Sequence, residues 1–356
     1  MAIVNFDIST TNGFQMNEKE ATEMSQFLFE RVITENVDRI NPVYTGIKMA
    51  QQIPFSSKLG LSGLAANTDS CERKESGAGL TFSEKQWMPV GIEDTFKFCV
   101  KDNSSAMALF KPYMDKIKSY KDMYEGYNGS DLGLFVAARV EESLNQAIFR
   151  AIWLGDTAAA AATTGVAGLA DASYVPFFTY FDGIIKQLAG VNAESLSFAD
   201  AEIVTGDEAI AAISQVWQSA PSTVRADRDA VFYVSGAIFA GLQLGLAKTQ
   251  TNFSLEYLEN GVPTINFMGH KVIDMSFVWD YNYTNYFVDD SGDPMVKRMI
   301  LFTNPNNVPA ATTSRDDLTS LEAWYSQDDR ISKVAYGLNL DAKVLNEDEL
   351  AFGVEA

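Results

Sequence analysis

One segment decides the fold: residues 130–156, which read SDLGLFVAARVEESLNQAIFRAIWLGD. Apolar residues recur there at every third or fourth position, the spacing of a helix with one face on a core. Ser130 is a candidate N-cap and Gly155 a candidate left-handed stop, so the pattern predicts a helix over residues 130–154. Phe149 and Trp153 fall among the polar positions of the opposite face. We therefore expect a spine helix that is in contact on both faces, with a main buried stripe of Leu134, Val136, Ala137, Val140, Leu144, Ala147, Ile148, Ala151 and Ile152.

The amino-acid composition limits the classes of protein to which the chain can belong. The chain has 356 residues, of which 47% are hydrophobic and 12% aromatic, so it can bury a large core. Lys and Arg number 27 against 47 Asp and Glu, which gives a formal net charge of −20. Such a charge repels phosphate backbones and argues against sequence-specific nucleic-acid binding. It also favours solubility and mutual repulsion between copies.

Cysteine usage and hydropathy indicate the compartment. Cys71 and Cys99 form no CxxC pair, and the N-terminus shows no secretory pattern, so we expect free thiols in a reducing cytosol. The longest uncharged apolar run covers residues 230–247. It divides into a strand and a helix capped by Ser235, and its glycines and polar residues predict that it does not span a membrane.

The first 36 residues predict an arm followed by one helix. Residues 1–16 carry no periodicity and predict an extended arm. Asn17 and Glu20 form a capping box at the start of a helix that we expect to end near Asn36. A helix this small has too little core of its own, so we expect it to dock on another part of the protein.

A long two-stranded excursion follows. Residues 47–55 and 80–100 predict two strands that enclose a glycine- and serine-rich stretch, residues 56–79. An isolated two-stranded ribbon is not stable in water. We therefore expect this excursion to lie on a neighbour, either elsewhere in the chain or in another copy.

The remaining pattern combines helices and strands into an α+β fold. Residues 104–120 predict a helix, and residues 157–170 predict a loop. Regular structure is expected to resume at Phe181. From residue 207 the elements alternate as in a compact unit with its own sheet. The predicted elements are helices 207–218 and 237–246 and strands 230–234, 262–267, 271–274, 299–303 and 331–338.

Residues that could carry chemistry are few. His270 is the only histidine, and its place between a glycine turn and a strand predicts a surface turn residue. Asp289, Asp290 and Asp293 lack the spacing of a calcium loop and predict a solvated turn. Glu141 and Glu142 diverge by about 100° on the helix, so they do not face one substrate. We assign no catalytic, cofactor-binding or metal-ligating residue.

The order of motifs resembles the HK97-fold major capsid proteins of tailed bacteriophages. An N-terminal arm precedes a two-stranded extension ending in Trp-Met-Pro-Val, and the spine helix closes in Trp-Leu-Gly-Asp at residues 153–156. Phe-Asp-Gly-Ile follows at 181–184. Phe-Met-Gly-His-Lys-Val-Ile at 267–273 and Leu-Phe-Thr-Asn-Pro-Asn-Asn-Val at 301–308 resemble later motifs of these proteins. Within them the chain looks closest to the crAss-like phages.

This resemblance implies an architecture and a function. The parts are an N-terminal arm (1–45), an E-loop (46–100), a P-domain (101–200 with the return 299–356) and an A-domain (201–298). The implied function is a non-enzymatic major capsid protein that assembles as hexamers and pentamers into an icosahedral head around double-stranded DNA. The implied partners are portal, scaffold and decoration proteins, without a membrane or a cofactor. Some relatives crosslink an E-loop lysine, but no signature singles out Lys74 or Lys85, and we assign no such site.

The same residues also allow two alternative functions. The excess of acids and the five tryptophans, Trp87, Trp153, Trp217, Trp279 and Trp324, suit a carboxylate-dependent hydrolase or a carbohydrate-active protein. Such an enzyme requires two carboxylates about 5–10 Å apart in a deep cleft. A minor virion component or an encapsulin-type nanocompartment shell is the other alternative.

Overall fold

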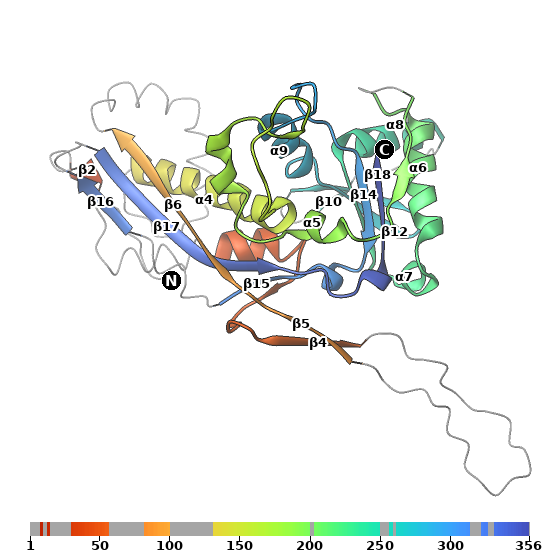
Figure 1. Ribbon diagram of the computed structural model, residues 1–356, viewed down its shortest axis with the longest axis horizontal. Helices are drawn as coiled ribbons and strands as arrows, with labels where there is room; N and C mark the ends of the chain where they lie inside the picture. The colour runs from red at the N-terminus through yellow and green to blue at the C-terminus, as the bar shows by residue number, and fades with distance from the viewer. Residues whose placement is uncertain are drawn as a thin grey trace, which may run out of the picture.

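The computed structural model describes ten stretches of the chain (Figure 1). They are residues 8–9, 13–14, 30–56, 82–99, 131–199, 203–249, 256–258, 261–313, 322–326 and 331–355. An α/β region with a seven-stranded sheet forms one end, and the spine helix α4 with a long bent ribbon forms the other (Figure 1). The fold is α+β, as the sequence predicts.

The spine helix α4 covers Asp131–Leu154, which confirms the predicted bounds to within one residue. Val140, Leu144 and Ile148 of the predicted stripe are buried in the main core. Phe149 and Trp153 on the other face are buried too. The helix is therefore in contact on both faces, whereas the predicted cap Ser130 lies outside the described residues.

The seven-stranded sheet runs in the order β10-β11-β12-β9-β14-β18-β8. Its strands are β8 Glu194–Leu196, β9 Val231–Val234, β10 Glu256–Tyr257, β11 Pro263–Phe267, β12 His270–Asp274, β14 Met299–Thr303 and β18 Leu350–Glu355. Successive strand residues point to opposite faces. Accordingly Tyr233 and Leu301 join the core of the spine helix, while Phe232 and Phe302 join a second core. The predicted strands and the fully buried strand 299–303 are confirmed.

Two helices build that second core. Helix α6 covers Gly206–Ser219 and helix α8 covers Gly236–Thr249, close to the predicted 207–218 and 237–246. They approach closely because glycines face each other: a Cβ on Gly206 would lie 2.4 Å from Cα of Gly245. A capping box on Thr205 and Glu208 begins α6.

A second sheet has five strands, in the order β16-β17-β15-β3, with β6 on the other side of β17. The strands are β3 Val43–Tyr44, β6 Val90–Cys99, β15 Ala310–Thr312, β16 Glu322–Ser326 and β17 Ile331–Ala342. The antiparallel pair β6 and β17 forms a long bent ribbon beside α4 (Figure 1). Tyr336, Leu338 and Leu340 of β17 contribute to the core of the spine helix.

The two-stranded excursion is only partly as predicted. β4 (Gln52–Ser56) and β5 (Phe82–Gln86) form an antiparallel hairpin that leaves the body (Figure 1). The prediction of one strand over 80–100 is wrong, because the chain divides at Trp87-Met88-Pro89. Proline lacks the N–H that a strand ladder needs, and β6 then pairs with β17 in the body.

The arm ends in a π-helix, Glu30–Val37, where the sequence predicts an α-helix ending near Asn36. Val32, Ile33 and Val37 are fully buried in the core of α4, so the expected docking is confirmed for this segment. The capping box of Asn17 and Glu20 lies outside the described residues.

The shorter elements complete the chain. They are β1 Ile8–Ser9, β2 Gly13–Phe14, β7 Gly168–Leu169, a 3-10 helix Ala172–Phe177, α5 Ile184–Leu188, α7 Ser222–Ala226, α9 Trp279–Tyr286, β13 Phe287–Val288 and the 3-10 turns Pro305–Asn307 and Glu347–Glu349. Residues 157–167 form a loop, and α5 confirms that regular structure resumes after Phe181. The predicted helix 104–120, the stretch 57–79 with Cys71 and Lys74, and the side chain of Cys99 lie outside the described residues.

Candidate assembly surfaces

The root of the hairpin is fixed to the body by polar contacts. Lys85 Nζ donates to the Val344 carbonyl at 2.6 Å and lies 3.3 Å from Glu347 Oε1. The Met88 amide donates to Asp341 Oδ2 at 2.7 Å. Burial raises the pKa of Asp341, and the hydrogen bond from Met88 opposes that rise. These bonds hold the hairpin at one place on the body.

Large apolar side chains stay exposed at this same root. Met49 is 70% exposed and Met88 is 50% exposed, although the neighbouring Trp87 is buried. Tyr44 stands beside Trp87 with ring centroids 6.3 Å apart and is also exposed. Apolar side chains clustered on a fixed backbone are typical of a surface that another protein covers.

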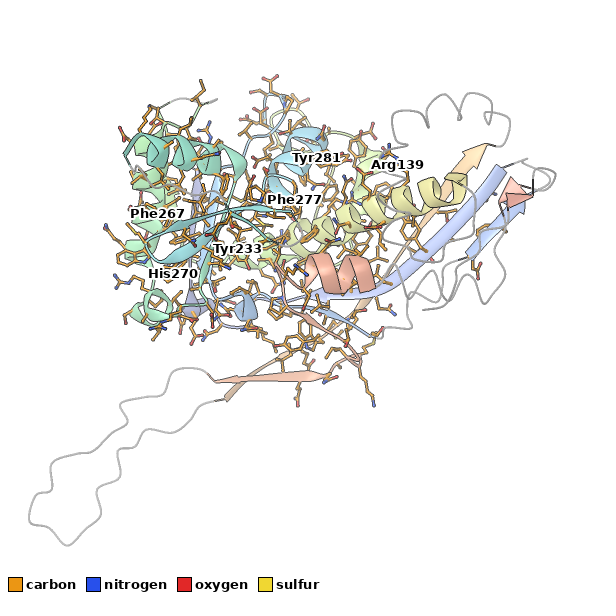
Figure 2. The ribbon with its side chains drawn as sticks, turned by 180° about the vertical axis from the view of Figure 1, so that it is seen from behind. Arg139, Tyr233, Phe267, His270, Phe277 and Tyr281 are labelled. Atoms are coloured by element: carbon orange, nitrogen blue, oxygen red, sulfur yellow. The ribbon has the colours of Figure 1, made fainter. Side chains whose placement is uncertain are left out.

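Three elements meet at the buried end of the spine helix. Trp153 Nε1 donates to Asn41 Oδ1 at 3.0 Å, and Asn41 Nδ2 donates to the Val308 carbonyl at 2.9 Å. The Tyr233 hydroxyl donates to the Ile40 carbonyl at 2.7 Å, and Figure 2 shows Tyr233 at the junction of the sheet with α4. These bonds join the arm to the spine helix, to strand β9 and to the chain just before β15. The sequence alone gives no signal for the role of Asn41.

The Trp-Leu-Gly-Asp segment ends the helix by close packing. The expected left-handed conformation at Gly155 is wrong, since its φ is not among the positive ones. Gly155 is instead needed for space, because a Cβ there would lie 2.4 Å from the Phe181 carbonyl oxygen. The Gly183 amide donates to the Gly155 carbonyl at 2.8 Å. Asp156 then pairs with Lys186 at 2.9 Å, which ties the helix end to α5.

His270 is not a surface residue, so this prediction is wrong. It begins β12 after a tight turn in which Met268 and Gly269 both have positive φ, a geometry that favours two-residue hairpins. Its ring is buried against Phe302 and contacts the Ala230 carbonyl through Nδ1 at 3.1 Å. Figure 2 shows it beside Phe267, its partner across the strands. The side chain is a structural part of the sheet core.

Two carboxylates with raised pKa lie close together in the body. Burial, with a smaller contribution from Asp274, raises the pKa of Asp280 to about 6. Asp280 Oδ2 accepts from the first amide of α8, Gly236, at 2.8 Å. Burial also raises the pKa of Asp274, which accepts from the Ser276 amide and hydroxyl. Both groups bind backbone, an arrangement that holds helix ends and loops in place.

The other acidic residues of interest serve local structure. Glu141 is buried while Glu142 is exposed and pairs with Arg139 at 2.7 Å, which confirms that they diverge. Asp289 accepts from the amides of Ser291 and Asp293, as expected for a turn. Among the described residues, no three His, Cys, Asp or Glu side chains are grouped as metal ligands. No helix in that part of the chain is long and apolar enough to cross a bilayer.

A cleft lies between elements that Figure 1 shows on the side of the body away from the hairpin. It has a volume of about 530 Å³ and lies between the loop 158–168, α5 and residues 295–297. Alanines, Val166, Tyr283 and Met295 form apolar walls, and two lysines, Lys186 and Lys297, line it. We call it the upper cleft.

Solved structures that are similar to this chain come from phages and related particles. A chain of Gordonia phage Cozz matches with a TM-score of 0.50 at 10% identity, over 88% of this chain and 84% of that chain. The chain has the HK97 capsid fold. The satellite phage P4 procapsid including size determination (Sid) protein matches at 14% identity and a TM-score of 0.49, over 92% of this chain and 98% of that chain.

The capsid of the native GTA particle is also similar to this chain. It matches at 11% identity and a TM-score of 0.49, over 91% of this chain and 90% of that chain. No protein-family model and no curated protein match the sequence. The match to the Gordonia phage Cozz chain confirms the predicted HK97 fold at the level of the fold, while the finer assignment to crAss-like phages stays a prediction.

Proposed function

We propose that this chain is the major capsid protein of a tailed bacteriophage. Copies assemble as hexamers and pentamers into an icosahedral head that encloses double-stranded DNA, and the protein resides in the virion. One observation carries the proposal: on an HK97 fold whose body has a complete core, Met49 and Met88 stay exposed at the root of a protruding hairpin. Such a surface needs a partner that every copy can supply.

The proposal assigns one part of an HK97 capsid subunit to each region of the chain. Residues 1–45 act as the arm and 46–100 as the E-loop, which we narrow to the hairpin region before β6. The P-domain comprises 101–200 with the return 299–356, and the A-domain covers 201–298. Support comes from the two cores, since the spine helix and the pair α6 and α8 bury separate sets of side chains.

The charge of the chain suits a container for DNA. A net charge of −20 makes tight binding to the phosphate backbone unfavourable, so the genome slides during packaging and ejection. DNA is enclosed without sequence-specific contacts. Portal, scaffold and decoration proteins complete the proposed set of partners.

The hydrolase alternative loses the support of three of its five tryptophans. Trp87, Trp153 and Trp279 are at most 2% exposed and therefore do not form a sugar-binding platform. Trp217 is packed against the guanidinium of Arg225 at 5.2 Å. The encapsulin-type shell shares the fold, and no contact described above favours it.

Size-exclusion chromatography with negative-stain microscopy of the expressed protein tests the proposal. We expect capsomers or closed particles with pentameric and hexameric units. A monodisperse monomer at every concentration, above all one that hydrolyses glycosides, would overturn it. Particles that load a protein cargo in place of DNA would point to the nanocompartment alternative.

A further inference from the structure

The upper cleft carries an uncompensated positive charge. Lys186 is paired with Asp156 at 2.9 Å, but Lys297 forms no ion pair with any described residue. The Lys297 ammonium lies 5.4 Å from the centre of the Tyr283 ring. Partial desolvation of the ammonium by the cleft lowers the pKa of Lys297, although the residue as a whole is exposed, so a carboxylate that entered the cleft would stabilise its charged form. In a chain of net charge −20, a lysine in an apolar cleft that has no ion-pair partner among the described residues indicates an acidic ligand.

The opposite edge of the body offers matching chemistry. The turn Glu347–Glu349 has three consecutive acidic residues, all exposed. Glu347 contacts Lys85, which joins the turn to the hairpin root that also carries the exposed Met88. The carboxylate of Glu349 makes no bond to a described residue, although its carbonyl accepts from Thr303. We call this surface, with Met49, the lower edge.

The two surfaces lie on different sides of the molecule. In Figure 1 the loops that form the upper cleft are at the top of the body, and the hairpin root and the final turn are at the bottom. A contact between different surfaces of identical subunits is heterologous, and repeated rotation closes such contacts into a ring. The upper cleft combines apolar walls with a lysine, and the lower edge combines exposed methionines with glutamates. A second copy is therefore a complementary occupant.

We propose that the upper cleft of one copy binds the lower edge of the next, with Lys297 facing Glu349. Methionines of the lower edge pack on the alanine, Val166 and Tyr283 walls, where flexible thioethers adapt well to an irregular apolar surface. The inference rests on the proposed function, because it describes how neighbours within a capsomer recognise each other.

Charge reversal tests the pairing. The variants are Lys297→Glu, Glu349→Lys and the double variant, with Lys248→Glu at the exposed end of α8 as the control of equal charge change. Light scattering gives the protein concentration at which half of the protein is in particles, and circular dichroism verifies that each variant is folded. The three substituted positions are exposed, so each of the four variants is expected to fold.

Each single reversal should raise that concentration by about tenfold or more, as expected for a close charged pair at an interface. The double variant should recover to within about threefold of wild type, and Lys248→Glu should behave as wild type. The pairing would be overturned by single variants that assemble normally, or by a double variant that assembles no better than the single ones. Either result would leave the proposed function intact, because the protein would still form shells. A wild-type protein that never assembles would instead contradict the proposed function.

Discussion

The seven-stranded sheet and the hairpin root differ in how their apolar residues are covered. In the sheet, Phe232 and Phe302 stack with ring centroids 4.1 Å apart and are fully buried. At the hairpin root only Trp87, with Ile47 and Ala311, forms a small separate cluster. Met49 beside that cluster remains mostly exposed. The sheet is complete within one chain, whereas the hairpin root presents apolar surface outward.

This contrast separates stability from assembly. Changes in the sheet should unfold the body, because burial of apolar area supplies most of the folding free energy. Changes at the hairpin root should leave the body folded and act on contacts between copies.

The largest effect is expected inside the sheet. Phe302→Ala removes a fully buried ring that stacks on Phe232 and contacts His270, so it should lower the free energy of unfolding by about 3–5 kcal/mol. Denaturant titration measures the change. Phe177→Ala is the control. Because Phe177 is 43% exposed, this substitution should lower the free energy of unfolding much less. Equal losses for the two variants would break the distinction between core and surface.

A pH-dependent effect is next in size. Asp280 has a pKa of about 6 in the folded protein, whereas the pKa of an unfolded Asp is about 3.9. Folding therefore takes up a proton at pH values between these two pKa values. As a result, the free energy of unfolding rises as the pH falls through this range. Asp280→Asn keeps an acceptor for Gly236 without the buried charge. At pH 7.5 it should be more stable than wild type by up to about 2–3 kcal/mol. Unfolding titrations should show this gap closing towards pH 4, and a constant gap would contradict the assignment.

A backbone contact at the end of the spine helix gives the third effect. Gly155→Ala places a methyl group 2.4 Å from the Phe181 carbonyl and 2.8 Å from the Ala151 carbonyl, so one segment must move. We expect a loss of about 1–3 kcal/mol, the usual range for overpacking. Gly190→Ala is the matched control, since a Cβ there meets nothing within 4 Å. Thermal melts that show no difference between the two variants would remove the packing explanation.

The smallest effect on stability is expected at the hairpin root. Lys85→Ala removes the bonds to Val344 and Glu347 from a side chain that is 30% exposed, so the free energy of unfolding should fall by less than about 1 kcal/mol. Assembly should nevertheless weaken, because the hairpin loses its fixed direction. Wild-type assembly in this variant, measured by light scattering, would show that Lys85 does not orient the hairpin.

Periodicity predicted the elements whose buried faces follow a helix or strand repeat. The spine helix, α6 and β14 match their predicted bounds closely because each has a long apolar pattern and a clear boundary. The order of short motifs then indicated the HK97 fold.

Local sequence patterns do not encode properties that depend on tertiary contacts. Gly155 has the signature of a helix stop, but its need for space comes from the chain at Phe181. His270 follows a turn, yet two phenylalanines from other strands bury it. The bonds of Asn41 and the upper cleft join segments more than 100 residues apart, and no local pattern encodes such pairings.

Deletion of Ser56–Gly79 tests the separation of body and hairpin most directly. Analytical ultracentrifugation and a thermal melt of the deletion variant, beside wild type, give its assembly state and its stability. We expect a soluble, folded protein with an unchanged melting temperature that forms no shells. Shells that form normally from the shortened chain would contradict the assignment of the hairpin to contacts between copies.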